Sequence, residues 1–254
     1  MQKTHSIKNF VKNSFDRAIF YEEFTPIQQE MAQIISSNLG SEEFESVLEI
    51  GSGSGYLTQS VNIKFKDYTC LDISENMIKG LKEKLKDQKG YNFMVSDAED
   101  CEFLERRFDV ILSSSCIQWF LDPEKTLRNF ISLLKENGQI HFSVFIEPTF
   151  KELKLSNIFS GFGSTLNLKD ESFYMNVFKD LNLNYKYVCT KKVYFQSVIE
   201  FLKFHKASGA RFTSFNRICS KEDFKNFCEF YEKNFKDREK IYATYSYLVA
   251  GFYK

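Results

Sequence analysis

The sequence predicts an α/β fold built on a doubly wound, mainly parallel sheet. Short apolar runs alternate with segments of helical periodicity from the amino terminus to Ile146. A glycine-rich turn follows the first apolar run, and acidic residues follow the next two. Because parallel strands need crossover helices, this alternation favours a sheet that is covered by helices on both faces.

Length, composition and charge limit the class of protein. The 254 residues are 43% hydrophobic and 17% aromatic, which is enough for the core of one large domain. Lys and Arg equal Asp and Glu at 34 each, so no overall field favours nucleic acid or an anionic membrane. No apolar run approaches the length of a membrane span. We therefore expect a cytoplasmic protein with neither nucleic-acid nor membrane partners.

The cysteines and histidines give no sign of a metal site. The six cysteines fall singly, without a C-x-x-C pair, and we expect reduced thiols. The histidines His5, His141 and His205 are spread along the chain. We expect His141 to be a strand residue beside the core rather than a catalytic base.

The elements of the first half follow from periodicity and from Gly and Pro positions. Residues 6–39 predict two helices, the second beginning at Pro26 after Thr25 and ending at Gly40. Strands are then expected at 46–50, 68–71, 92–95, 108–112 and 139–146, with helices at 75–86 and 123–134.

The second half predicts a helix at 169–181, a strand at 186–195, a helical stretch at 197–236 and a last strand at 241–253. The sheet is thus expected to have seven strands, with the helical stretch inserted between the last two. We expect one domain, residues 1–254, in which residues 1–40 and 197–238 form a lid.

Glycines at positions 51, 53 and 55 follow Glu49 at the end of the first strand. They allow a sharp turn and a close approach of the backbone to a ligand. A dinucleotide site of the G-x-G-x-x-G type would have its third glycine at Tyr56. The G-x-G-x-G pattern instead resembles motif I of class I methyltransferases. That resemblance implies a Rossmann-like fold and S-adenosyl-L-methionine as cofactor.

Two further acids follow strands of the same sheet. Asp72 ends the second strand, where a carboxylate can accept hydrogen bonds from both ribose hydroxyls. Asp97 follows the third strand and is placed to accept a hydrogen bond from the adenine amino group. Either acid alone could be a helix N-cap or a solvated loop residue. Three acids, each following a strand, favour a ligand site at the carboxyl edge of the sheet.

Strand four leads into residues 113–119, Ser-Ser-Ser-Cys-Ile-Gln-Trp. Methyltransferases that act on amino groups of DNA bases carry an acidic or amide residue, two prolines and an aromatic residue at this edge. The chain lacks that pattern, which disfavours a flipped base as substrate. Trp119 is either a wall of the methyl-transfer pocket or a core residue.

Several blocks resemble the malonyl-[acyl-carrier protein] O-methyltransferases of biotin synthesis. They are 15–18 with Tyr21 and Gln28, 49–55, 71–74 with Met77, 117–119, 142–153, 205–210 and 242–245. The resemblance implies methylation of the free carboxylate of a malonyl thioester carried by an acyl carrier protein or by coenzyme A. The chain departs from the family at Ser114, where Asn is usual.

The resemblance also implies which residues form the site. The acceptor residues are Tyr21, Gln118, Arg211 and Tyr245. The cofactor-binding residues are Gln28, Glu49, Gly51, Gly53, Gly55, Asp72, Ile73, Met77, Asp97, Ala98 and Ser114. A malonyl carboxylate is ionised at neutral pH and needs no general base to become a nucleophile.

The expected lid carries a modest basic excess, which would suit an acidic carrier protein. Residues 197–240 hold ten Lys and Arg against seven Asp and Glu, and residues 1–20 hold four against one. A solvated helix face gives the same pattern.

Two other functions stay open: another small-molecule methyltransferase, such as a quinone-ring C-methylase or an aconitate-type carboxyl methylase, and a non-catalytic cofactor-binding module.

Overall fold

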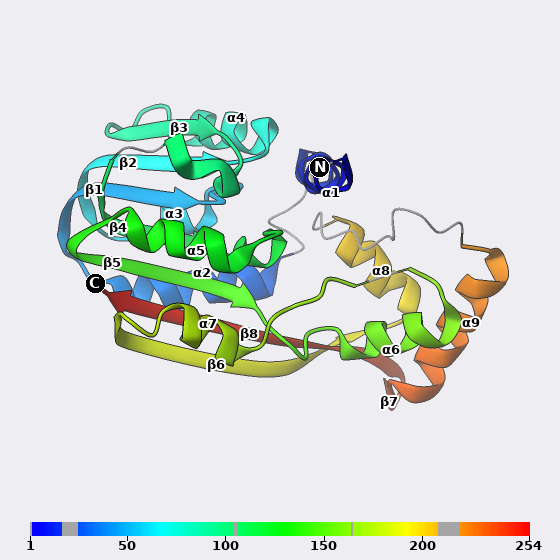
Figure 1. Cartoon of the computed structure of the whole chain (residues 1–254). Helices are drawn as coiled ribbons and strands as arrows, with labels where there is room; N and C mark the ends of the chain where they lie inside the picture. The colour runs from blue at the N-terminus through cyan, green and yellow to red at the C-terminus, as the bar shows by residue number, and fades with distance from the viewer. Residues whose placement is uncertain (1, 17–24, 104–105, 164, 208–218) are drawn as a thin grey trace.

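A computed structural model describes residues 2–16, 25–103, 106–163, 165–207 and 219–254 (Figure 1). Within them, one sheet has the strand order β3-β2-β1-β4-β5-β8-β6, and the short β7 pairs with β8. Strands β1 to β5 pair in parallel, whereas β8 runs antiparallel to β5 and β6. The expected doubly wound, mainly parallel sheet is therefore confirmed. The strands are β1 Glu43–Ile50, β2 Lys64–Asp72, β3 Tyr91–Val95, β4 Phe108–Ser114, β5 Leu134–Phe145, β6 Asn182–Phe195, β7 Lys236–Asp237 and β8 Lys240–Tyr253.

The helices begin and end largely where caps and prolines predict. Pro26 occupies the first turn of α2 after Thr25, and Gly40 ends that helix, as expected. The side chain of Ser74 caps α4 by accepting the Met77 N–H. The α-helices are α1 Gln2–Asp16, α2 Pro26–Leu39, α3 Tyr56–Ser60, α4 Glu75–Lys84, α5 Pro123–Ser132, α6 Lys151–Ser160, α7 Glu171–Val177, α8 Val198–Ala207 and α9 Lys221–Asn234.

The core lies on both faces of the sheet because successive strand residues point in opposite directions. Val47 of β1 packs in one buried cluster with Met31 of α2. The next residue, Leu48, packs in a second cluster with Leu127 and Phe130 of α5. Aromatic side chains of the α8 and α9 segment join the first cluster. The inserted helices are thus part of the same packed core as α2.

Some boundaries differ from the sequence prediction. Helix α6 was not expected, and α7 is shorter than the predicted 169–181. The stretch expected to be helical over 197–236 contains two helices, α8 and α9, and residues 208–218 between them lie outside the described residues. Phe150, in the left-handed region at φ 58°, precedes α6. A phenylalanine at that position is no helix-start signal, so tertiary contacts fix where α6 begins.

The carboxyl ends of the parallel strands point toward α1 and α8 (Figure 1). Helices α8 and α9 lie between β6 and β8 in the chain, where the insert was expected. Helices α1 and α8, which are far apart in the sequence, thus both lie toward the edge where open α/β sheets bind ligands (Figure 1). In the part of the chain that the structure describes, no helix has the length and apolarity required to span a bilayer.

Candidate active site

The three glycines after β1 all adopt positive φ, at 68° for Gly51, 51° for Gly53 and 86° for Gly55. A Cβ on Gly51 would lie 2.4 Å from the Cys116 Sγ, and one on Gly55 would lie 2.2 Å from the Leu81 Cδ1. A Cβ on Gly53 would meet nothing nearer than the Gly51 oxygen at 3.9 Å. Gly51 and Gly55 are therefore needed for packing, whereas Gly53 leaves open space beside the turn.

Glu49 lies inside β1 rather than after it, which corrects the expectation that all three acids follow strands. Its side chain is buried, and its Oε2 accepts the hydroxyls of Tyr68 at 2.6 Å and Thr58 at 2.7 Å. Burial raises the pKa of Glu49 to about 7, against the opposing effect of these hydrogen bonds. The carboxyl group can therefore gain or lose a proton near neutral pH.

Asp72 is the last residue of β2, as expected, and both of its carboxylate oxygens bind backbone. Oδ2 accepts the N–H of Gly53 and Oδ1 accepts the N–H of Ser74, each at 2.8 Å. Burial raises the pKa of Asp72, while the Ser74 and Gly53 hydrogen bonds oppose that rise. Asp72 thus joins the glycine turn to the start of α4.

Asp97 follows β3 and meets a partner that the sequence did not indicate. Its Oδ2 lies 2.6 Å from the Nζ of Lys8 in α1, which also lies 3.5 Å from the Glu99 Oε2. Its Oδ1 accepts the Glu99 N–H at 2.9 Å. Desolvation is the largest single effect on the Lys8 amine and lowers its pKa. The hydrogen bond to Asp97 and the nearby acids outweigh it together, so the pKa of Lys8 is raised. This ion pair holds α1 against the carboxyl edge of the sheet.

Three adjoining hollows surround the glycine turn, and we name them pockets A, B and C. Pocket A, of about 740 Å³ including its mouth, contains the acids Asp72 and Asp97. Pocket B, of about 380 Å³, contains Glu49. Pocket C, of about 790 Å³, contains Gln118 and Tyr245.

Ser115 lines all three pockets. It has a positive φ of 55°, which is uncommon for a residue with a side chain, and its N–H donates to the Ser143 oxygen at 3.0 Å. Phe15 and Trp119 line both A and C, and their rings meet edge to face at 5.4 Å. Trp119 is therefore a pocket wall. A ligand that fills A and B would reach pocket C at Ser115.

Several polar atoms in these pockets are buried without a hydrogen-bond partner among the described residues. They include Ser52 Oγ and Ser54 Oγ beside pocket B and Gln118 Oε1 beside pocket C. Gln118 is held from its other side, where Nε2 donates to the Ser115 oxygen at 2.5 Å. Buried polar groups usually have partners, so these atoms point to a polar ligand.

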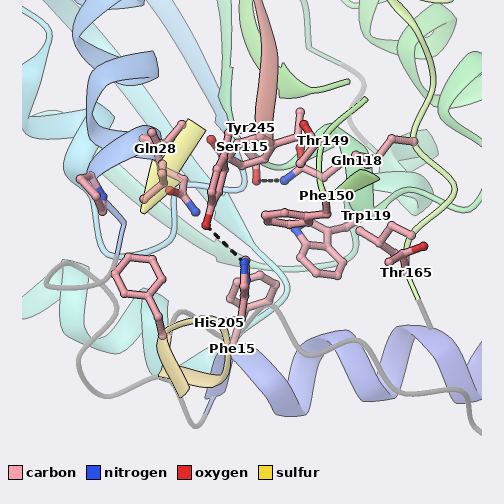
Figure 2. A pocket seen from close by; sticks show the side chains of 17 residues that line it. Phe15, Gln28, Ser115, Gln118, Trp119, Thr149, Phe150, Thr165, His205 and Tyr245 are labelled. Atoms are coloured by element: carbon pink, nitrogen blue, oxygen red, sulfur yellow. Dashed lines mark hydrogen bonds between the residues drawn. The ribbon is translucent and has the colours of Figure 1, made fainter. Parts of the chain in front are cut away.

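Pocket C is lined by aromatic and neutral polar side chains (Figure 2). No Lys, Arg, Asp or Glu is among its described lining residues. Figure 2 shows Tyr245 of β8 and His205 of α8 pointing toward each other, with the Tyr245 hydroxyl 3.3 Å from the His205 Nε2. Burial lowers the pKa of His205 to about 3, so this imidazole is neutral. The sequence alone assigns His205 no function, because a single histidine in a helix carries no distinguishing pattern.

The structure brings most of the expected site residues together. Gly51, Gly53, Asp72, Ile73, Met77, Asp97, Ala98 and Ser114 line pocket A, and Gln28, Glu49, Gly51, Gly53 and Ser114 line pocket B. Gln28 also lines pocket C with Gln118 and Tyr245. Gly55 lines none of the three pockets and acts instead as the N-cap residue of α3. Tyr21 and Arg211 lie outside the described residues.

His141 is a buried residue of β5, as expected. Its Nδ1 lies 3.0 Å from the Tyr185 hydroxyl and its Nε2 lies 2.9 Å from the Gln139 Oε1. None of His141, Tyr185 and Gln139 lines pocket A, B or C. No group of three or more His, Cys, Asp or Glu side chains suited to a metal ion occurs among the residues with described positions.

Comparisons with known proteins agree with this geometry. Residues 48–142 match the family described as a methyltransferase domain. The N-methyltransferase NodS from Bradyrhizobium japonicum, solved with S-adenosyl-L-homocysteine, has a TM-score of 0.59 at 12% identity, over 96% of this chain and 98% of that one. At that identity the likeness concerns the fold alone. The comparison supports a methyltransferase fold.

Two curated relatives cover nearly the whole chain. The malonyl-[acyl-carrier protein] O-methyltransferase of Calditerrivibrio nitroreducens is 34% identical over 92% of this chain and 92% of its own length. Malonyl-[acyl-carrier protein] O-methyltransferase 1 of Ilyobacter polytropus is 30% identical over 93% of this chain and 91% of its own. At this identity and coverage, the chain belongs to the malonyl-[acyl-carrier protein] O-methyltransferase family.

Proposed function

We propose that this protein is an S-adenosylmethionine-dependent methyltransferase that esterifies the free carboxylate of malonyl-acyl carrier protein, an early step of biotin synthesis. The observation that carries the proposal is the junction at Ser115. There pocket C, whose described lining is uncharged and includes hydrogen-bonding and aromatic side chains, opens onto two pockets lined by the glycine turn and its acids.

Pockets A and B fit the cofactor by their chemistry. Asp72 and Asp97 would accept hydrogen bonds from the ribose hydroxyls and the adenine amino group in pocket A. Glu49 would face the amino group of the methionine end in pocket B, and the buried Ser52 and Ser54 hydroxyls lack other partners in the described chain. When bound, S-adenosylmethionine supplies a sulfonium methyl group whose transfer to a carboxylate oxygen yields the methyl ester and S-adenosylhomocysteine.

Pocket C would hold the malonyl group. Its carboxylate is ionised at neutral pH, so the reaction needs no general base and His205 does not act as one. Tyr245 and Gln118 provide hydrogen-bonding atoms beside the aromatic walls. The side chains would hold the carboxylate in line with the methyl group, and such orientation can lower a barrier by up to roughly 7–11 kcal/mol.

The aromatic lining also limits water in the pocket. Phe15 and Trp119 stand between pockets A and C, and Phe150 and Phe204 line C itself. A carboxylate that loses its hydration shell there would be held by fixed protein donors instead. Tyr21 and Arg211 remain acceptor-site assignments that rest on the family resemblance.

An acyl carrier protein is the proposed partner, with malonyl-coenzyme A as its smaller counterpart. The basic excess of residues 197–240 would favour a highly acidic partner. Because an extended partner uses a larger charged area than coenzyme A, added salt should reduce turnover more strongly with the carrier protein.

A radiolabelled methyl-transfer assay tests the proposal. Purified protein with labelled S-adenosylmethionine would receive malonyl-acyl carrier protein, malonyl-coenzyme A, free malonate, aconitate or a quinone precursor. We expect base-labile label, as in a methyl ester, on the malonyl thioesters. Folded protein that binds the cofactor yet labels only aconitate or the quinone would contradict the proposed acceptor. Cofactor binding without transfer to any acceptor would favour a non-catalytic module.

A further inference from the structure

His205 and Tyr245 form a pair of buried polar groups that the reaction outlined above does not use as acid or base. They come from different elements, α8 and β8, and meet at 3.3 Å on the wall of pocket C. We propose that the His205 Nε2–H donates to the Tyr245 oxygen, so that the Tyr245 hydrogen points into pocket C and donates to the acceptor carboxylate. This inference rests on the proposed function, which places a carboxylate there.

The surroundings of His205 keep its ring in one place and uncharged. Its ring lies 4.4 Å from that of Phe150 and 4.8 Å from that of Phe201, at angles of 89° and 88°. The side chain is buried, and the lowered pKa follows from that burial. A neutral imidazole has one N–H and one bare nitrogen, so only the tautomer decides which group His205 presents to Tyr245.

The two tautomers have opposite consequences for pocket C. If Nε2 is bare, Tyr245 donates to His205, and its oxygen presents only lone pairs to an anion. If Nε2 carries the hydrogen, Tyr245 accepts from His205 and donates its own hydrogen into the pocket. His205 is the only hydrogen-bond partner of the Tyr245 hydroxyl in the described structure. A carboxylate in pocket C stabilises the second arrangement because it can accept that hydrogen.

The described lining of pocket C gives this hydrogen a specific use. The donors among those residues are uncharged, and they replace part of the water lost by the carboxylate. A neutral donor fixes an oxygen in position without itself adding a positive charge that would lower its nucleophilicity. The methyl ester product has lost the negative charge and accepts this hydrogen bond less strongly, which favours its release. His205 is thus a positioning residue that makes the pocket selective for a free carboxylate.

A double-mutant cycle tests the pairing. His205→Phe keeps an aromatic ring but removes Nε2, and we expect kcat/KM for malonyl-acyl carrier protein to fall by roughly tenfold or more, with cofactor affinity within about twofold. His205→Gln can place an amide N–H near the same point and should restore most of that loss. Tyr245→Phe should cost about as much as His205→Phe, and the double variant should be within about twofold of Tyr245→Phe alone.

The matched control is His141→Phe, which alters the second buried histidine–tyrosine contact, outside the three pockets. Its kcat/KM should stay close to that of the unmodified protein. If the losses of His205→Phe and Tyr245→Phe multiply, or if Gln does not rescue, His205 acts through packing rather than through Tyr245.

Nitrogen-15 shifts of His205 provide a readout that does not depend on turnover. We expect the Nε2–H tautomer in unmodified protein, with a changed Nε2 shift in Tyr245→Phe. An Nδ1–H tautomer would overturn the inference even if malonyl thioesters are substrates. Conversely, an Nε2–H tautomer in a protein that methylates no malonyl thioester would contradict the proposed function while leaving the histidine–tyrosine pairing supported.

Discussion

The Asp72 carboxylate accepts the backbone N–H of Gly53 at 2.8 Å, which ties the end of β2 to the glycine turn after β1. The other carboxylate oxygen accepts the Ser74 N–H at the start of α4. One side chain therefore shapes the turn and also lines pocket A. Replacing it should affect the pocket and the turn together.

Asp72→Asn should weaken S-adenosylmethionine binding by at least about tenfold, because an amide has one acceptor oxygen for two backbone N–H groups and the ribose. The amide nitrogen would face either the Gly53 or the Ser74 N–H. Titration calorimetry measures the affinity, and circular dichroism checks that the fold is kept. An unchanged dissociation constant would remove Asp72 from the cofactor site.

Gly53→Ala should weaken cofactor binding and disturb the packing of the protein little. A Cβ there has open space, so the cost to folding is chiefly the strain of a positive φ, about 1 kcal/mol. Gly55→Ala is the matched control, since its Cβ would lie 2.2 Å from the Leu81 Cδ1 and should reduce stability more. Urea unfolding and calorimetry on both variants separate the effects. Equal affinity in Gly53→Ala and the unmodified protein would show that the ligand does not approach this residue.

Glu49→Gln should stabilise the cofactor-free protein above neutral pH. The pKa of Glu49 is near 4.5 in the unfolded chain and is raised to about 7 by burial in the fold. The ionised form is therefore disfavoured in the fold, and the associated loss of stability develops as pH rises from about 4.5 to 7. An amide has no charge to bury. The free energy of unfolding of the variant should therefore exceed that of the unmodified protein by roughly 2–3 kcal/mol at pH 8 and by almost nothing near pH 4.5.

Cofactor binding gives a second readout for Glu49. If the carboxylate faces the cationic amino group, binding near pH 7 should release a proton from Glu49, and Glu49→Gln should release none. Calorimetry in buffers of different ionisation enthalpy measures this proton. Equal release by both proteins would assign it to another group.

The buried histidines should make the fold sensitive to acid. Burial lowers the pKa to about 3 for His205 and about 4 for His141, against about 6.5 in the unfolded chain. As pH falls below 6.5, the two imidazoles bind protons in the unfolded chain but stay neutral in the fold. The free energy of unfolding therefore decreases between about pH 6.5 and these lower pKa values. Each histidine should contribute up to about 1.4 kcal/mol per pH unit.

His205→Phe isolates one of these contributions. Relative to the unmodified protein, the variant should become more stable as pH falls from 6.5 to 5, so its free energy of unfolding should be larger by comparison. Urea titration at each pH measures this difference. A difference that does not change with pH would mean that His205 binds a proton as readily in the fold as in the unfolded chain. That result would contradict the buried, persistently neutral imidazole on which the Tyr245 pairing depends.

The doubly wound sheet, the turn at Gly51 to Gly55 and the positions of Asp72 and Asp97 at the sheet edge could all be predicted from the amino-acid sequence. These features follow from local chemistry. A buried strand needs an apolar run, a positive φ favours glycine, and parallel strands bring their carboxyl ends to one edge. Each can be recognised from a short segment without knowledge of what packs against it.

Which distant side chains meet could not be predicted from the sequence and is seen in the three-dimensional structure. Lys8 reaches Asp97 because α1 lies across the carboxyl edge, and His205 reaches Tyr245 because α8 packs against β6, the strand that pairs with β8. The start of α6 and the junction of three pockets at Ser115 likewise depend on tertiary contacts. Such contacts depend on how helices pack onto the sheet, and packing joins residues whose local sequences carry no signal for each other.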